Sequence, residues 1–259
     1  ITATVNGEEI PEAFENQVPV NCRTCHQVHN EFGRDDYALT ISTPVDLFTG
    51  GTHDNGNGNL CANCHQSRPI SPLPTIGGDP ITIGSFRYGP HYAPQSNILS
   101  SNALFEFTGS ASYPASNPHA TACSNCHMID PVADYPTNSY VTGGHTFLMA
   151  WDDEGTDVEA VEACQQCHGS ATSFDAFGGQ TAVQGLLDDL EALLVAEGIL
   201  RDDGSGYANT GDGDADVAAA FLNWKFVWHD SSLGVHNPVY VRALLTNTIE
   251  TMEARVATK

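Results

Sequence analysis

The stretch Cys123-Ser124-Asn125-Cys126-His127 sets the pattern that decides how this chain of 259 residues folds. Its spacing returns three more times, so that all 8 cysteines fall into Cys-x-x-Cys-His motifs. The other three motifs are Cys22-Arg23-Thr24-Cys25-His26, Cys61-Ala62-Asn63-Cys64-His65 and Cys164-Gln165-Gln166-Cys167-His168. Histidine makes up only 11 of the 259 residues, so a histidine after every cysteine pair is not a chance arrangement.

This spacing is typical of the covalent attachment of c-type haem. Two thiols three positions apart on one helical turn can each form a thioether with a haem vinyl group, and the next residue places an imidazole under the iron. We therefore expect four haem c groups, attached through the eight cysteines. The expected proximal iron ligands are His26, His65, His127 and His168.

Other uses of the cysteines explain the pattern less well. A disulfide framework gives no role to the histidine that follows each pair. Two Cys₄ zinc sites would join pairs that are far apart, since 35 residues lie between Cys25 and Cys61, and zinc ribbons use shorter spacings. A thioredoxin-like redox motif would occur only once.

The composition restricts the partners and the compartment. The chain has 32 Asp and Glu against 9 Lys and Arg, a net charge of −23, which argues against binding to nucleic acid or to an anionic membrane. No apolar run reaches the roughly 18–20 residues of a membrane-spanning helix, so we expect no membrane insertion. Haem attachment to such motifs takes place outside the cytoplasmic membrane, so we expect an exported protein whose signal peptide has been removed.

Each haem iron needs a second axial ligand for electron transfer, and the chain has seven further histidines. This number is sufficient for four bis-histidine haems, whereas methionine occurs only at 128, 149 and 252. The seven histidines are His29, His53, His91, His119, His145, His229 and His236.

The arrangement of motifs and periodic segments predicts a mainly α fold with extensive coil, few or no β-strands and a core built largely from haem. Residues 1–180 contain all four motifs and many Gly, Pro and Asn residues, so we expect a tetrahaem region of loops and short helices. Residues 181–259 contain no cysteine and show helical periodicity from Val183 to Leu194 and from Asp216 to His229. A last helix should start with Asn237 as N-cap and Pro238 at its first position. These helices should pack on the haem region in one compact unit.

The acidic stretch from Asp202 to Asp216 partly resembles a calcium loop. It lacks the bidentate glutamate that ends an EF-hand loop. The favoured interpretation is a solvated acidic loop that caps the next helix, and bound Ca²⁺ is the alternative.

The residues around the motifs resemble those of multihaem cytochromes related to ammonia-forming nitrite reductases and octahaem oxidoreductases. The resemblance lies in Tyr88-Gly89-Pro90-His91, Pro118-His119, Gly143-Gly144-His145 and Leu233-Gly234-Val235-His236-Asn237-Pro238. It implies that His91, His119, His145 and His236 are distal ligands. His53 and His229 match no part of this pattern and are expected to be loop or surface residues.

Four haems in a chain of this size also resemble the tetrahaem cytochromes that form extracellular filaments, similar to outer-membrane cytochrome E and its archaeal relatives. In that family a histidine three residues after the first proximal histidine, here His29, ligates a haem of the neighbouring subunit. The resemblance implies a head-to-tail homopolymer at the cell surface or outside the cell, which exchanges electrons with redox proteins or extracellular acceptors. The five distal candidates exceed the four sites by one.

Two alternatives remain at this point. One is a monomeric periplasmic or cell-surface tetrahaem shuttle with every ligand supplied by its own chain. The other, less favoured, is a multihaem oxidoreductase acting on nitrogen oxyanions. The chain has no Cys-x-x-Cys-Lys motif, and its excess of histidines argues against an open iron, so we expect an electron carrier and not an enzyme.

Overall fold

The computed structural model describes residues 4–5, 8–9, 19–102, 104–130, 132–134, 139–153 and 156–257. The chain divides into two compact units, residues 1–42 and residues 43–259. The boundary near residue 180 that the sequence suggested stays a prediction.

The first unit contains one Cys-x-x-Cys-His motif, on the short helix α1 (Cys22–Cys25). The side chain of Asn21 accepts a hydrogen bond from the backbone N–H of Arg23 at 3.0 Å, so Asn21 caps the helix. The chain then loops through the 3₁₀ turn η2 (Arg34–Tyr37) and returns to the motif, where the N–H of Thr40 donates to the carbonyl of Cys25 at 2.9 Å. The strands β1 (Thr4–Val5) and β2 (Glu8–Glu9) form an antiparallel pair.

In the second unit, the remaining motifs also lie on single-turn helices, as the sequence predicted. These helices are α2 (Asn59–Ala62), α4 (Ser124–His127) and α5 (Glu162–Gln165). A further short helix, α3 (Gln95–Leu99), and the 3₁₀ turns η3 (Gly56–Gly58), η4 (Gly144–Thr146) and η5 (Ala176–Gly178) connect them.

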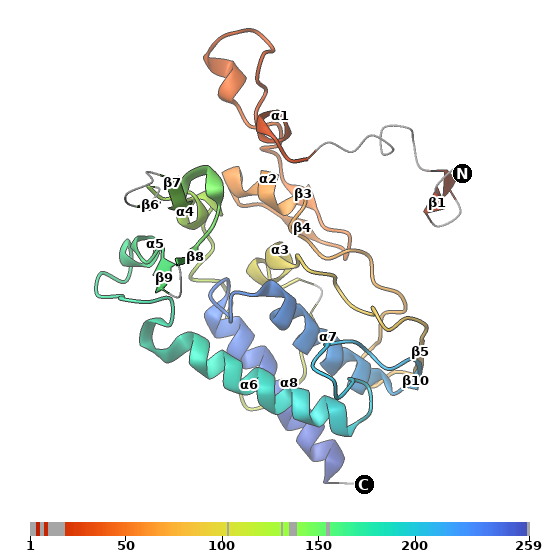
Figure 1. The fold of residues 1–259 in the computed structure, drawn as a ribbon. Coiled ribbons are helices and arrows are strands. Elements are labelled where there is room, and N and C mark those ends of the chain that lie inside the picture. The colour runs from red at the N-terminus through yellow and green to blue at the C-terminus, as the bar shows by residue number, and fades with distance from the viewer. Residues whose placement is uncertain are drawn as a thin grey trace. The chain divides into compact units, whose positions relative to one another are not determined.

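Three long helices form the hydrophobic core of the second unit: α6 (Gly179–Ala196), α7 (Ala215–Asp230) and α8 (Pro238–Val256). They pack against one another in Figure 1, which confirms the three helices expected from periodicity. Helix α7 is buried along nearly its whole length. Core side chains that are at most 2% exposed include Leu187, Leu190, Leu194, Phe221, Leu222, Trp224, Leu244 and Leu245.

The start of α8 differs in one detail from the expectation. Asn237 is the N-cap residue and Pro238 follows it, but the side chain of Asn237 makes no capping hydrogen bond. Its amide donates instead to the carbonyl of Ile98 at 3.1 Å and to Oγ of Ser101 at 3.0 Å. Asn237 therefore anchors the segment before α8 to the end of α3.

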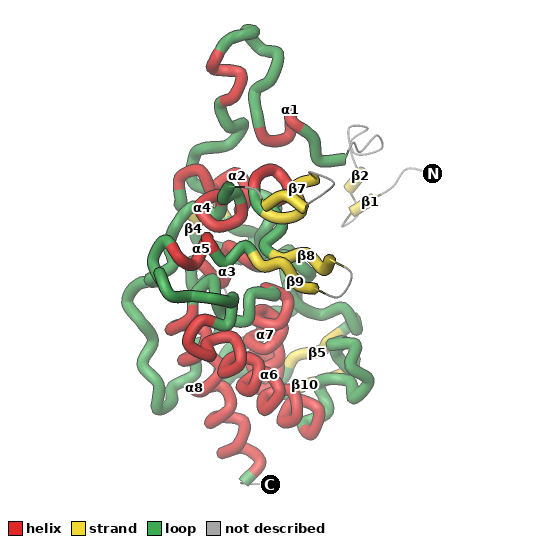
Figure 2. Tube along the Cα trace, turned by 60° about the vertical axis from the view of Figure 1, so that its left-hand side comes forward, coloured by secondary structure: helices red, strands yellow, loops and turns green. Residues whose placement is uncertain are grey.

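The described strands are two to four residues long and pair only in two-stranded antiparallel sheets. Figure 2 shows them as short yellow segments between red helices and green loops. The pairs in the second unit are β3 (Val45–Asp46) with β4 (Thr52–His53), β5 (Ile81–Ile83) with β10 (Gly211–Gly213), β6 (Val132–Asp134) with β7 (Ser139–Thr142), and β8 (Ala150–Asp153) with β9 (Thr156–Glu159). The fold is thus mainly helix and coil, as predicted.

The acidic stretch caps α7, in agreement with the favoured interpretation. Oδ1 of Asp214 accepts hydrogen bonds from the N–H groups of Asp216 at 2.9 Å and Val217 at 3.4 Å. Arg255 of α8 joins Asp214 at 3.0 Å and Glu197 at 3.3 Å. In the part of the chain that the structure describes, no group of three or more His, Cys, Asp or Glu side chains is placed to hold a metal ion. Bound Ca²⁺ at this stretch stays a prediction.

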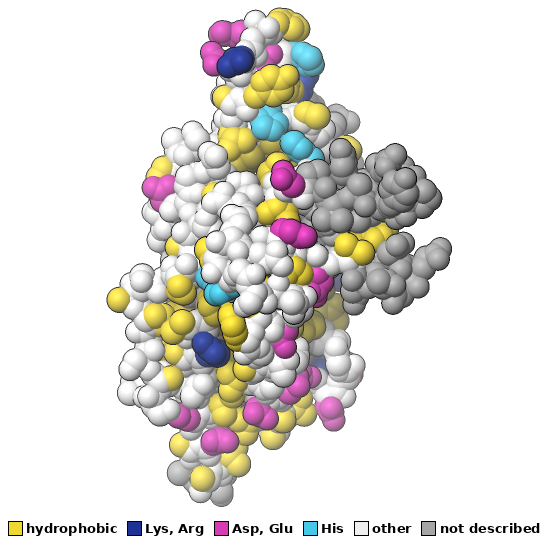
Figure 3. Space-filling view, turned by 90° about the vertical axis from the view of Figure 1, so that its left-hand side faces the viewer, with side chains coloured by type: hydrophobic (Ala, Val, Ile, Leu, Met, Phe, Trp, Pro, Cys, Tyr) yellow, Lys and Arg dark blue, Asp and Glu magenta, His cyan; other side chains and the backbone are white. Residues whose placement is uncertain are grey.

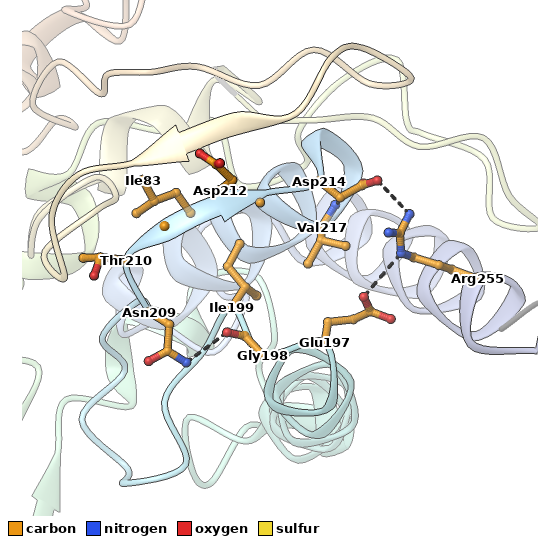
Figure 4. A pocket seen from close by; sticks show the side chains of 12 residues that line it. Ile83, Glu197, Gly198, Ile199, Asn209, Thr210, Asp212, Asp214, Val217 and Arg255 are labelled. Carbon is orange, nitrogen blue, oxygen red and sulfur yellow. Dashed lines mark hydrogen bonds and ion pairs between the residues drawn. The ribbon is translucent and has the colours of Figure 1, made fainter.

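A cavity of about 220 Å³ lies beside this ion pair. Figure 4 shows Arg255 between Glu197 and Asp214 at one end of the cavity and Asn209 at the other. No cysteine or histidine lines this cavity, so it is separate from the motifs. None of the helices that the structure describes combines the length and hydropathy needed to cross a bilayer.

Candidate functional site

The motifs at 61–65, 123–127 and 164–168, called motifs 2, 3 and 4 below, lie next to one another. Gly58, just before motif 2, places its carbonyl 3.9 Å from Sγ of Cys123. On the other side of motif 3, Nε2 of Gln166 donates to the carbonyl of Asn125 at 3.2 Å. Motif 3 therefore contacts the segment before motif 2 on one side and motif 4 on the other. The motif at 22–26, motif 1, belongs to the first unit.

Motif 3 brings its proximal histidine opposite a predicted distal ligand. The ring centres of His127 and His236 are 6.3 Å apart, and their planes differ by 27°. Each ring is held from behind, because Nδ1 of His127 lies 3.0 Å from the carbonyl of Phe147 and Nδ1 of His236 lies 2.7 Å from Oδ1 of Asp230.

Motif 4 has the same kind of arrangement. The ring centres of His168 and His119 are 6.0 Å apart, and their planes are inclined at 69°. Nδ1 of His119 lies 2.6 Å from the carbonyl of Val235. As in motif 3, this contact engages Nδ1 and leaves Nε2 as the ring nitrogen that could bind a metal ion.

These distances fit one metal ion between each pair of rings. A metal–imidazole nitrogen bond is about 2 Å long, and the ring centre lies roughly 1 Å beyond the nitrogen, so two imidazoles on opposite sides of an iron have centres roughly 6 Å apart. Metal-binding histidines also usually donate their other N–H to a carbonyl or carboxylate. Both pairs meet the first condition, and His127, His236 and His119 also meet the second.

One loop positions both distal histidines. Residues 231–237 join α7 to α8 in a tight path with positive φ at Ser231, Leu233 and Gly234. The side chain of Asn117 links the backbone of His119 to that of His236. Its amide nitrogen donates to the carbonyl of His236 at 2.7 Å, and its amide oxygen accepts from the N–H of His119 at 2.9 Å. The packed helices α7 and α8 thus set the position of both rings.

Local electrostatics differ between the two members of the motif 3 pair. Burial lowers the pKa of His127 and favours the neutral imidazole that binds metals. Burial alone would also lower the pKa of His236, but the charge of Asp230 and its hydrogen bond outweigh this effect and raise it. The carboxylate of Asp230 is fully buried. It contacts Nδ1 of His236 and accepts a hydrogen bond from the hydroxyl of Ser232.

Motif 2 is linked to this site through a glutamine. Nδ1 of His65 lies 3.1 Å from Oε1 of Gln95, and Nε2 of Gln95 donates to the backbone carbonyl of Asp230 at 3.2 Å. The carbonyl of His65 also accepts from the N–H of Ser96 at 3.0 Å. Helix α3 therefore orients the proximal ring of motif 2 and ties it to the ligand support of motif 3.

The other three distal candidates lie next to aromatic side chains. His91 is exposed, has a φ of 71°, and meets Tyr92 edge to face at 5.0 Å. His145 is exposed on η4, with Phe147 at 6.1 Å. His29 is exposed, with Phe32 at 5.7 Å. Their roles as ligands stay predictions.

The expectation for His53 and His229 was wrong, since both are buried, at 4% and 6% exposure. His53 lies on β4 with its Nδ1 2.7 Å from Oγ of Ser100. His229 stacks on Tyr92 at 4.6 Å, and burial lowers its pKa to about 4. The Gly- and Asn-rich residues around His53 indicate a loop, and no local pattern shows its contact with Ser100 at the end of α3.

Exposed aromatic rings lie near several histidines, which fits the binding of a large apolar group. Phe177, 83% exposed, lies 5.6 Å from the ring of His168, and Phe32 of the first unit is 84% exposed. Both residues, and Phe147 beside His127, have a φ of 57–58°, a conformation that costs a bulky L-residue about 1–2 kcal/mol. Figure 3 shows histidine and hydrophobic side chains side by side at the surface. Exposed rings of this kind would suit contact with a large apolar cofactor.

Comparisons with known proteins agree with this interpretation. No protein-family model matches the chain. The C-type polyheme cytochrome OmcB from two strains of Geobacter sulfurreducens is 24% identical in a match that covers 82% of this chain and 32% of OmcB. The crystal structure of the outer cell wall cytochrome OcwA is similar with a TM-score of 0.53 and 18% identity, over 95% of this chain and 42% of OcwA.

The chain thus spans about a third of the length of OmcB and less than half of OcwA. The likeness to OcwA shows the fold, and the likeness to OmcB extends over most of the region that carries the motifs. Together with the four Cys-x-x-Cys-His motifs and the two opposed histidine pairs, they support a multihaem c-type cytochrome.

Proposed function

We propose that this chain transfers electrons through four covalently attached haem c groups, each with two histidine ligands. The observation that carries the proposal is the pair of opposed imidazoles beside motifs 3 and 4, at 6.3 and 6.0 Å. When bound, haem iron supplies a one-electron couple between its ferric and ferrous states.

The residues of the chain would perform three tasks in this function. The cysteine pairs attach the cofactors, and the adjacent positions of motifs 2, 3 and 4 keep them close enough for electron exchange. The paired histidines would hold each iron through two ring nitrogens, which favours a carrier over an enzyme that needs an open iron. The partners of Nδ1, among them Asp230 and the carbonyl of Val235, hold the rings in place in both oxidation states.

We further propose that the chain is a subunit of an extracellular filament in which His29 ligates a haem of the next subunit. Supporting this proposal, Asp36 accepts hydrogen bonds from the N–H groups of Glu31, His29 and Phe32 at 2.9, 2.9 and 3.1 Å. These contacts hold His29 at a φ of 64° and leave its side chain exposed. A ligand supplied to a neighbouring subunit creates a head-to-tail interface. Such an interface forms an open filament when the rotation from one subunit to the next does not close into a ring.

An exported location is consistent with the relatives, one of which is described as an outer cell wall cytochrome. The net charge of −23 opposes assembly at long range, but physiological salt screens it beyond roughly 8–10 Å. Coordination at contact can therefore outweigh the repulsion.

Electron microscopy of the haem-loaded protein tests the filament directly. We expect filaments from the wild type and from Asn30→Ala, a control at the neighbouring exposed position, and none from His29→Ala, although intact-mass measurement still finds four haems. Filaments of His29→Ala with every haem low-spin would remove His29 from this role. A wild type that stays monomeric would instead favour the tetrahaem shuttle.

A further inference from the structure

Helix α3 begins with a glutamine whose side chain contacts the proximal histidine of motif 2. Oε1 of Gln95 lies 3.1 Å from Nδ1 of His65, and Nε2 of Gln95 donates to the backbone carbonyl of Asp230 at 3.2 Å. Both contacts come from one amide group. The amide of Gln95 therefore bridges the ring of His65 and the end of α7.

The contact with Asp230 fixes the orientation of the amide and, through it, the tautomer of His65. A backbone carbonyl can only accept hydrogen bonds, so the NH₂ end of Gln95 faces Asp230 and the oxygen end faces His65. An amide oxygen is also only an acceptor, so Nδ1 of His65 carries the proton. A neutral imidazole has one protonated nitrogen. The lone pair of His65 therefore lies on Nε2, the nitrogen that would bind iron.

The two residues after Gln95 hold the same part of the chain in place. The carbonyl of His65 accepts from the N–H of Ser96 at 3.0 Å and from its hydroxyl at 2.5 Å. Oδ1 of Asn97 accepts from the N–H of Ser67 at 2.7 Å. Ser96 and Asn97 are at most 2% exposed. The start of α3 is thus fixed against the end of motif 2, which gives the side chain of Gln95 a defined position beside the ring.

The acceptor at motif 2 differs in charge from the acceptor at motif 3. At motif 3 the carboxylate of Asp230 lies 2.7 Å from Nδ1 of His236, whereas at motif 2 the acceptor is the neutral amide oxygen of Gln95. Groups that accept from the outer nitrogen of a metal-binding histidine make the ring a stronger donor to the metal. A negative acceptor does this more than a neutral one and so stabilises ferric iron. The neutral amide of Gln95 leaves the iron easier to reduce.

We infer that Gln95 is a positioning residue for electron transfer: it selects the iron-binding tautomer of His65 and keeps the haem of motif 2 at a higher reduction potential than a charged acceptor would. This inference rests on the proposed function. Gln95 acts through the ring of His65, 30 positions earlier in the chain, and not on the iron itself.

The experiment measures the four midpoint potentials of the full-length, haem-loaded protein by spectroelectrochemical titration at pH 8. Gln95→Leu removes the acceptor, so one midpoint potential should rise. Gln95→Glu supplies a carboxylate, which is ionised at this pH because the ordinary pKa of glutamate is about 4.3, so the same potential should fall. A purely structural role of Gln95 predicts shifts in one direction, or none.

Gln180 provides the matched control. It is half-buried like Gln95, and its Nε2 also donates to a backbone carbonyl near the end of α7, that of Ser232, at 3.1 Å. Its hydrogen bonds within the described residues go to Ser232 and Asp175 and not to a histidine. Gln180→Leu and Gln180→Glu should therefore not reproduce the opposite shifts of a single potential.

A second set of variants assigns the shifted potential to its haem. Cys61→Ser with Cys64→Ser removes the thiols of motif 2, and in that three-haem protein the Gln95 substitutions should leave the remaining potentials unchanged. Shifts that persist there would overturn the inference, as would equal titration curves for the wild type and both Gln95 variants. If Gln95→Leu does not fold, Gln95→Glu, which is nearly the same size, still decides, because a potential that does not fall would overturn the inference.

The failure of the inference can be distinguished from the failure of the proposed function. A wild type with fewer than four haems, or with a high-spin haem of its own, would contradict the function. A wild type with four low-spin haems whose potentials respond to neither Gln95 substitution would contradict the inference alone.

Discussion

Replacing Asp230 with asparagine should change the redox behaviour of one haem and leave the others nearly unchanged. The carboxylate of Asp230 is fully buried and lies 2.7 Å from Nδ1 of His236, and its charge helps to raise the pKa of that ring. Asparagine keeps the size and an oxygen acceptor but removes the charge. The substitution therefore tests electrostatic support of the ligand at nearly constant geometry.

The expected magnitude follows from the role of such supporting groups. Removing the hydrogen-bonding partner of a metal-binding histidine typically weakens metal binding about 10- to 100-fold. A negative partner makes the imidazole more electron-donating and stabilises ferric iron more than ferrous iron. If the loss falls on the ferric state, the potential of the motif 3 haem rises by roughly 60–120 mV, since a tenfold change corresponds to about 59 mV for one electron.

A spectroelectrochemical titration of wild type, Asp230→Asn and Asp188→Asn measures this shift. Asp188 is an exposed residue of α6, so Asp188→Asn removes the same charge at a position where solvent screens it. We therefore expect only a small shift of the reduction potentials, spread over all haems. Equal titration curves for Asp230→Asn and Asp188→Asn would refute the role assigned to Asp230 and to its contact with His236.

Two further predictions concern ligand orientation and pH. The ring planes of His127 and His236 differ by 27° and those of His119 and His168 by 69°, so the ferric protein should show one rhombic low-spin signal and one with much larger anisotropy. A ferric spectrum in which all low-spin signals have the same shape would contradict these angles. Burial, followed by the charge of Arg68, lowers the pKa of Lys225 to about 8, so the unfolded chain binds more protons than the folded one between that value and the ordinary pKa of lysine near 10.4. The free energy of unfolding should therefore rise by roughly 2–3 kcal/mol from pH 8 to pH 10, measured by chemical denaturation with circular dichroism. The Lys225→Met protein should lack this rise, and an equal rise in both proteins would contradict the burial effect.

The elements that the sequence predicted are those determined locally. A Cys-x-x-Cys-His motif requires one helical turn, and the apolar spacing from Val183 to Leu194 forms one face of a helix whatever the rest of the chain does. The three C-terminal helices and the short motif helices were therefore predictable. Even at Asn237, where the helix start was correct, a tertiary contact with Ile98 and Ser101 replaced the expected capping bond.

The pairing of ligands depends on contacts between distant segments and could be predicted only in part. His119 and His236 were predicted as candidates from their flanking residues, but the rings they meet, His168 and His127, depend on the path of the loop at 231–237. The burial of His53 was missed because its contact with Ser100 joins residues 47 positions apart, and the Gly-rich surroundings gave no periodic signal. Local patterns identify candidate ligands, whereas the packing of α7 and α8 decides which of them meet.

The central claim, four haems each with two histidine ligands, is tested most directly on the wild-type protein by combining its intact mass with carbon monoxide binding after reduction. The account predicts a mass that corresponds to four covalent haems, only low-spin iron in the ferric protein, and no carbon monoxide binding under native conditions. Stoichiometric binding of carbon monoxide at one haem, without denaturation, would show an open axial position and contradict the account.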